Sequence, residues 1–154
     1  MRFFLIDRID ELKRFVHADA VKCISLADDC FEHHFPGQPV YPGVFLIEAM
    51  AQLGGALMEI SLRKDDEPMP RCVLSKVEAK FRDFARPGDQ LRLHAEVLSH
   101  HPDSARLRAQ VMRDEKKIAE ADLIYILLRI DDPAVEASRR QYLSIITRQT
   151  RFVD

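Results

Sequence analysis

Residues 42–62 carry the sequence PGVFLIEAMAQLGGALMEISL, and this stretch decides the fold. Its apolar residues fall on nearly every side of a helix, with few polar interruptions before Glu59. A helix that is apolar all round is a buried helix. Pro42 stands where the first turn of a helix tolerates proline. The stretch therefore predicts one long helix inside the protein.

Two consecutive glycines, Gly54 and Gly55, lie within this predicted helix. Glycine in a helix interior costs roughly 1 kcal/mol relative to alanine. Their presence predicts that another part of the protein packs very close to the helix at this point.

Extended segments are predicted on both sides of the helix. Before it, residues 3–6 and 15–26 mix β-branched and apolar residues with polar ones, and a loop follows at 27–41. After it, four segments alternate apolar and polar residues with a period of about two: 72–84, 90–98, 105–112 and 118–130. Such alternation is typical of antiparallel strands with one face in water.

Together these elements predict an α+β protein. We expect a hot-dog fold, an antiparallel sheet of five or six strands wrapped around one long buried central helix, over residues 1–132. Asp132 suits an N-cap and Pro133 the first position of a further helix, so we expect residues 133–154 to form a helical C-terminal extension. Such a sheet leaves its outer edge uncovered, which favours a dimer.

Composition and charge exclude several classes of function. A content of 47% hydrophobic and 31% charged residues is that of a soluble globular protein. The formal net charge of −2 gives no reason to expect nucleic acid as a partner. We expect no membrane span and no signal peptide, and hence a cytoplasmic protein. The three cysteines lack the spacing of metal ligands, so we expect free thiols and no metal.

The densest set of chemically useful residues runs from His34 to Gln52. His34 begins a loop held by prolines and a glycine, and Glu48 lies in the second turn of the apolar helix. A buried carboxylate costs several kcal/mol unless it is paired or hydrogen-bonded. The residues alone leave three plainer alternatives open: a surface or capping role for His34, a salt bridge from Glu48 to an arginine, and a simple hydrogen bond from Gln52 to Glu48.

The string HFPGQPVYPGVFLIEAMAQ at residues 34–52 resembles the signature of the 3-hydroxyacyl-[acyl carrier protein] dehydratases of bacterial fatty acid synthesis, the FabA/FabZ family. It is similar to the FabZ branch in particular, because Glu48 stands where the FabA branch has aspartate. Residues 3–8 resemble the family's first strand. Residues 81–91 resemble its later F-R-x-x-x-x-P-G-D-x-L element.

This resemblance implies that the protein removes water from (3R)-3-hydroxyacyl thioesters and gives trans-2-enoyl thioesters. It implies His34 and Glu48 as the catalytic pair, contributed by different subunits at the interface of a homodimer. A dimer alone and a trimer of dimers both stay open as the complete assembly. The substrate-binding residues that it implies are Gly43, Val44, Gln52 and Phe35. No cofactor is implied, since the substrate arrives on the phosphopantetheine arm of acyl carrier protein.

An acyl carrier protein is acidic, so we expect a local basic patch to bind it, although the net charge of this protein is negative. The cluster that fits is Arg82 and Arg86 with Lys76 and Lys80. The alternative for these four residues is that they are solvated charges on the face of a strand.

The sequence also departs from the family's pattern. His33 stands where the family usually has glycine, which would strain the backbone if that position needs a positive φ. The segment 134–154 extends beyond the family's usual end. Both differences favour a specialised paralogue that serves a polyene, polyketide or lipid pathway. Two other functions stay open at this point: a hot-dog acyl-thioesterase, and a non-catalytic hot-dog module that binds acyl carriers.

Overall fold

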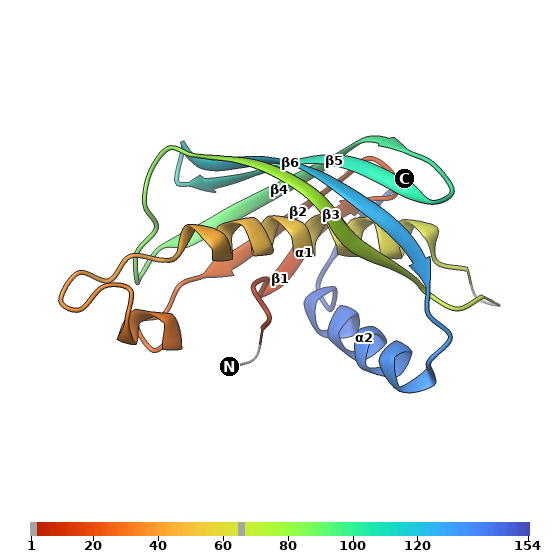
Figure 1. Ribbon diagram of the computed structural model, residues 1–154, viewed down its shortest axis with the longest axis horizontal. Helices are drawn as coiled ribbons and strands as arrows, with labels where there is room; N and C mark the ends of the chain where they lie inside the picture. The colour runs from red at the N-terminus through yellow and green to blue at the C-terminus, as the bar shows by residue number, and fades with distance from the viewer. Residues whose placement is uncertain (1–2, 65–66) are drawn as a thin grey trace.

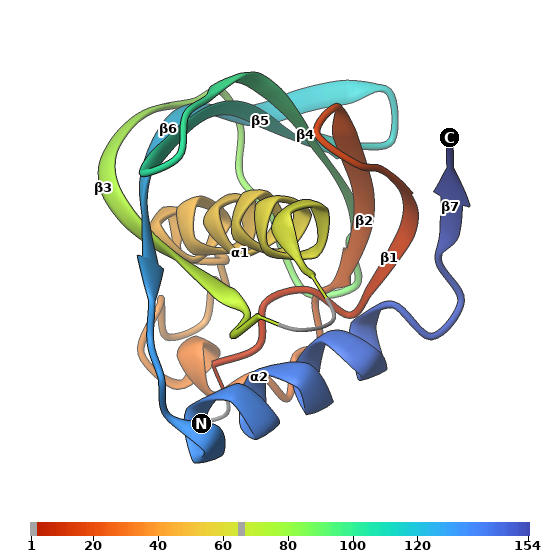
Figure 2. The same ribbon diagram turned by 90° about the vertical axis from the view of Figure 1, so that its right-hand side faces the viewer.

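The computed structural model describes residues 3–64 and 67–154. The helix α1 (Gly43–Leu62) lies along a curved sheet, and a second helix, α2 (Pro133–Ile146), lies beneath its C-terminal half (Figure 1). A view along α1 shows the strands curving over it and α2 below it (Figure 2). The fold is therefore the α+β hot-dog fold that the sequence predicts.

The sheet has seven strands in the order β3-β6-β5-β4-β2-β1-β7. In chain order they are β1 (Arg8–Lys13), β2 (His17–Cys23), β3 (Pro70–Phe81), β4 (Gln90–His100), β5 (Ser104–Arg113), β6 (Lys116–Arg129) and β7 (Arg151–Val153). A short 3₁₀ helix, η1 (Asp29–Glu32), precedes the loop that leads to α1. All neighbouring strands are antiparallel except β7, which runs parallel to β1.

The sequence predicts five or six strands, whereas the sheet has seven, because β7 was not expected. This strand has three residues, which is too short to leave a period of two in the sequence. It nevertheless forms part of the sheet because Arg151 and Val153 are in register with Glu11 and Lys13.

The first predicted strand is also misplaced, because β1 begins at Arg8 and residues 3–6 are not in a strand. The backbone of this segment bonds to a side chain of α1 instead of to another strand. The N–H of Leu5 donates to Oε1 of Gln52 (3.0 Å), and Nε2 of Gln52 donates to the carbonyl of Phe3 (3.0 Å). The apolar residues of 3–6 thus pack along the helix rather than in the sheet.

The close approach that the two glycines predict occurs at Gly54. A Cβ at this position would lie 2.6 Å from the hydroxyl oxygen of Tyr125, whose O–H donates to the carbonyl of Ala51 (2.8 Å). At Gly55 the nearest atom would be Cβ of Cys72 at 3.7 Å, an ordinary contact. Only the first glycine is therefore required by packing.

The core helix α1 also bears on the expectation that no segment spans a membrane. By length and composition α1 is apolar enough to do so, with a mean hydropathy of 1.4. However, 67% of that window is buried inside the protein, which is the environment of a core helix.

The second helix, α2, begins as the sequence predicts. The side chain of Asp132 accepts hydrogen bonds from the backbone N–H groups of Ala134 (2.9 Å) and Val135 (3.1 Å), and Pro133 occupies the first turn. One face of α2 is buried in the same core as α1, through Tyr142, Leu143 and Ile146. The expected boundary at residue 132 falls between β6 and α2.

Candidate active site

The loop before α1 holds the imidazole of His34 in one orientation. Its Nδ1 lies 2.6 Å from the carbonyl oxygen of Val40, which can only accept, so Nδ1 carries the hydrogen and donates. In the neutral ring Nε2 is then the unprotonated nitrogen. The ring of Phe35 stacks on that of His34, with 4.2 Å between centroids. The loop therefore presents a base, held by hydrogen bonding and stacking.

The adjacent His33 is a weaker candidate for the functional imidazole. Its backbone adopts a φ of −125°, so the histidine in place of the family's glycine causes no strain. The side chain is exposed. The structure thus favours His34 over His33, because the ring of His34 is the one that the loop orients.

At the N-terminus of α1, the N–H groups of Gly43 and Val44 have no backbone acceptor among residues 3–64 and 67–154. Gly43 and Val44 are its first two residues, and the N-cap residue Pro42 provides no side-chain cap. The first N–H groups of a helix have no acceptor within the helix and lie at the positive end of its dipole. Gly43 leaves room for a close contact here, since a Cβ would lie 3.0 Å from the ring of Phe81. This terminus can stabilise negative charge on an oxygen atom.

Glu48 is half-buried and accepts a hydrogen bond from Nε2 of Gln52 at 3.0 Å, one turn further along α1. This is the simple hydrogen bond that the sequence left open. Among the residues that the structure describes, no arginine or lysine forms a salt bridge with Glu48. Its carboxyl group is therefore oriented by an amide and not neutralised by a cation.

A cavity of about 430 Å³, here called the Glu48 cavity, lies beside this face of α1. The helix contributes Glu48, Ala51, Gln52, Gly55 and Glu59, and the N-terminal segment, β3, β6 and α2 complete the lining. Burial raises the pKa of Cys72, a β3 residue in this lining, to about 12. A thiol with so high a pKa is not a nucleophile at neutral pH.

The buried carboxylate of α1 is Glu59, and the sequence pattern marks this residue only as the polar limit of the apolar stretch. Glu59 is 1% exposed. Nε of Arg139 donates to it at 2.6 Å and the backbone N–H of Cys72 at 3.1 Å, while Nε of Arg71 lies 3.7 Å away. The spacing of eleven residues from Glu48, three helical turns, could have indicated that both share one face.

The structure does not bring His34 and Glu48 together within one chain. His34 is absent from the residues that line the Glu48 cavity, and its imidazole bonds to the backbone of its own loop. Gly43, Val44 and Phe35 are likewise absent from that lining, whereas Gln52 is part of it. In a single chain the predicted site is therefore in two parts.

Comparison with known proteins defines the family. The FabA-like domain family matches residues 1–122. The chain is 39% identical over 125 residues to the 3-hydroxyacyl-[acyl-carrier-protein] dehydratase FabZ of a Nitratiruptor species, and the match covers 79% of this chain and 84% of that protein. It is 41% identical to the FabZ of Campylobacter fetus, with the same coverage of both proteins. The chain belongs to the FabA-like family.

Solved structures that resemble this member of the FabA-like family share its fold at low sequence identity. A hot-dog-like protein from Thermanaerovibrio acidaminovorans matches with a TM-score of 0.63 at 14% identity, covering 91% of this chain and 93% of that one. A hypothetical thioesterase from Streptococcus pneumoniae, solved with coenzyme A, matches with a TM-score of 0.63 at 13% identity, covering 81% and 88%. At this identity the likeness shows the fold alone.

The four basic residues expected to bind a carrier protein lie on β3 and the loop that follows it. All four are exposed, and Lys76 and Lys80 share the outer face of the strand with Glu78. The guanidinium of Arg82 pairs with Glu120, and that of Arg86 lies 5.7 Å from the centre of the Phe84 ring. The patch in this FabA-like protein thus contains acidic side chains as well as basic ones.

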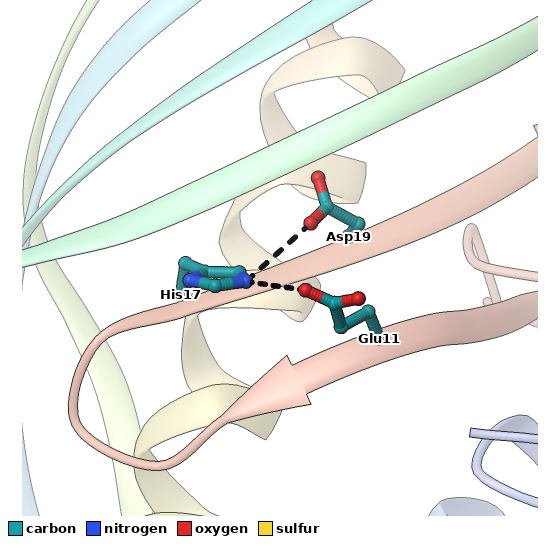
Figure 3. Close-up of side chains that lie close together, drawn as sticks. All are labelled: Glu11, His17 and Asp19. Atoms are coloured by element: carbon teal, nitrogen blue, oxygen red, sulfur yellow. Dashed lines mark hydrogen bonds and ion pairs between the residues drawn. The ribbon is translucent and has the colours of Figure 1, made fainter. Parts of the chain in front are cut away.

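A second cluster of titratable side chains lies on the outer face of the sheet, away from α1 (Figure 3). Nε2 of His17 is 2.9 Å from Glu11 and 3.8 Å from Asp19, and the three potential ligand atoms lie within 4.8 Å of one another. The acidic groups also bond elsewhere, Glu11 to Arg151 and Asp19 to His94. Protein partners therefore satisfy this cluster, which links β1, β2, β4 and β7.

Proposed function

We propose that this protein removes water from (3R)-3-hydroxyacyl groups on acyl carrier protein and produces trans-2-enoyl thioesters. The observation that carries the proposal is the hydrogen bond from Nδ1 of His34 to the carbonyl of Val40, which leaves Nε2 as a base. Membership of the FabA-like family and the FabZ names of the relatives support the same reaction.

In the proposed mechanism Nε2 of His34 takes a proton from C2 of the substrate. Negative charge then develops on the thioester oxygen, where the N–H groups of Gly43 and Val44 stabilise it. Glu48 gives a proton to the C3 hydroxyl, which leaves as water while the C2–C3 double bond forms. His34 ends with the extra proton and Glu48 without one, so a proton must return before the next turnover. The elimination needs no cofactor.

We place the complete site at the interface of a homodimer, with His34 and Glu48 contributed by different subunits. Strand β3 is an edge of the sheet, and its side chains Val73, Val77 and Phe81 are exposed. A bare apolar edge favours association with a second copy. The separation of His34 from the Glu48 cavity within one chain supports this arrangement.

The partner in solution is an acyl carrier protein in the cytoplasm. Lys76, Lys80 and Arg86 have exposed cationic groups that can attract its acidic surface, whereas the charge of Arg82 is largely offset by Glu120.

The test is turnover of a 3-hydroxyacyl carrier protein with three variants. His34→Ala and Glu48→Gln should each lower kcat by at least about a hundredfold, since each removes a general acid or base. The matched control is His33→Ala, which should keep the activity of the wild type. Formation of the enoyl product supports the proposal. Release of free thiol would identify a thioesterase, and binding without turnover a non-catalytic module.

A further inference from the structure

The residues of α1 that line the Glu48 cavity indicate the direction in which a bound acyl chain would run along the helix. Glu48, Gln52, Gly55 and Glu59 follow one another along a single face of the helix. If the proposed function holds, on which this inference rests, the thioester oxygen lies at Gly43 of the subunit that contributes His34, and the C3 hydroxyl lies at Glu48 of the other subunit. The remaining acyl chain then continues along the same face towards Glu59.

The far end of this path is charged. Glu59, Arg71 and Arg139, here called the charged wall, place two guanidinium groups around one buried carboxylate. The side chains of Arg139 and Arg71 are 16% and 28% exposed, and that of Glu59 is 2% exposed. An apolar chain end pressed against this wall would remove its remaining water and offer no hydrogen bond in return.

The charged wall also lies between the linings of two neighbouring cavities, because its two arginines belong to both. Arg71 and Arg139 line both the Glu48 cavity and a second cavity of about 460 Å³ that continues along α2. Tyr142 of α2 stands beside them. Its ring stacks on Phe4 at 4.5 Å and its hydroxyl donates to Gln52 at 3.3 Å. Burial raises the pKa of Tyr142 to about 12, so this hydroxyl stays protonated and the hydrogen bond persists at neutral pH.

We propose that the charged wall, completed by Arg139 of α2, sets an upper limit on the apolar acyl chain that the protein accepts. Eleven residues separate Glu48 from Glu59, which is about 16 Å along the helix. A fully extended chain advances roughly 1.2 Å per bond, so the path beyond C3 holds about a dozen bonds at most. An eight-carbon substrate ends before the wall, whereas a sixteen-carbon substrate reaches it.

The experiment compares kcat/KM for eight-carbon and sixteen-carbon 3-hydroxyacyl carrier proteins. The test variant is Glu59→Leu with Arg139→Met, because replacing both partners of a buried ion pair avoids leaving an unpaired charge. The control is Glu136→Leu with Arg140→Met, a hydrogen-bonded pair on the same helix that does not line the Glu48 cavity. A second variant, Glu59→Gln with Arg139→Gln, removes the charges but keeps polar side chains if the first one fails to fold.

The ratio of kcat/KM for the longer over the shorter substrate should rise at least about tenfold in the test variant and stay the same in the control. The inference is overturned if the ratio is equal in all proteins, or if the wild type already accepts both substrates equally. Failure of the proposed function looks different, because the wild type would then give no enoyl product from the eight-carbon substrate.

Discussion

Gln52 connects three parts of the protein through one amide group. Its Oε1 accepts from the N–H of Leu5 and the hydroxyl of Tyr142, and its Nε2 donates to Phe3 and Glu48. The bond to Glu48 could be expected from the spacing of one helical turn. The other three could not, because they join segments 47 to 90 residues apart in the sequence. The carboxyl of Glu48 is thus held from both ends of the chain.

The two glycines of α1 should respond in opposite ways to replacement by alanine. Gly54→Ala places a Cβ 2.6 Å from the hydroxyl of Tyr125. We expect it to lower the free energy of unfolding by about 1–3 kcal/mol, as overpacking does. Gly55→Ala has room, and alanine stabilises a helix, so it should raise the free energy of unfolding by up to about 1 kcal/mol. Urea unfolding measures both, and equal effects would contradict the packing difference.

At the scale of elements, strong periodicity predicts the structure well. Alternation over residues 90–98, 105–112 and 118–130 places β4, β5 and β6 within two residues of their observed bounds. The prediction for β3 extends to residue 84, whereas the strand ends at Phe81. It ends there because the N–H groups of Arg82 and Asp83 both turn to the carbonyl of Ile118.

The candidate site was harder to predict because its polar groups come from different elements. A motif over residues 34–52 indicates His34, Glu48 and Gln52, since these residues are close in sequence. Arg139 lies 80 residues from Glu59, and nothing local pairs the two. The sequence therefore predicts the end of the cavity where the reaction is proposed, but not the charged end.

The pairing of β2 with β4 should make stability depend on pH. The pKa of His94 is raised mainly by its hydrogen bond to Asp19 (2.8 Å). The negative charge of Glu96 adds to this effect. The folded protein then binds this proton more tightly than the unfolded chain. The stabilisation is complete below the unfolded pKa of about 6.5 and is lost as the pH rises through the higher pKa of folded His94.

This is measured by the free energy of unfolding of His94→Gln at about pH 6 and pH 8. The variant should lose more stability relative to the wild type at the lower pH. The control is His101→Gln, in the exposed turn between β4 and β5. A loss that is the same at both pH values would show that the Asp19–His94 pair is not the cause. His17 also lies beside His94, with 5.8 Å between rings, and bonds to Glu11.

At the scale of the whole molecule, the sheet and α2 enclose α1 from opposite sides (Figure 2). Strand β6 leads into α2 near one edge of the sheet, and β7 follows α2 at the other edge. The segment after residue 132 therefore joins the two sides of the sheet beneath the helix. Its residues reach the Glu48 cavity, although the FabA-like match ends at residue 122.

Mixing two inactive variants tests whether the site is shared between subunits. In a mixed dimer of His34→Ala and Glu48→Gln, one site has both substitutions and the other has neither. Random exchange of subunits in a symmetric dimer should therefore restore about a quarter of the wild-type activity. The measurement is turnover after the variants are unfolded and refolded together. If the mixture is as inactive as each variant refolded alone, each site belongs to one chain.

Strand β7 has a consequence for how far association can proceed. A sheet with two bare edges could add further copies at each end and grow into a fibre. Here β7 covers the edge of β1 with only three residues, and Arg151 places a charge there that pairs with Glu11. Short, charged edges resist further strand pairing. Within the part of the chain that the structure describes, β3 is then the remaining open edge of the sheet. In the proposed dimer, two β3 edges that face each other would leave no edge for a third copy.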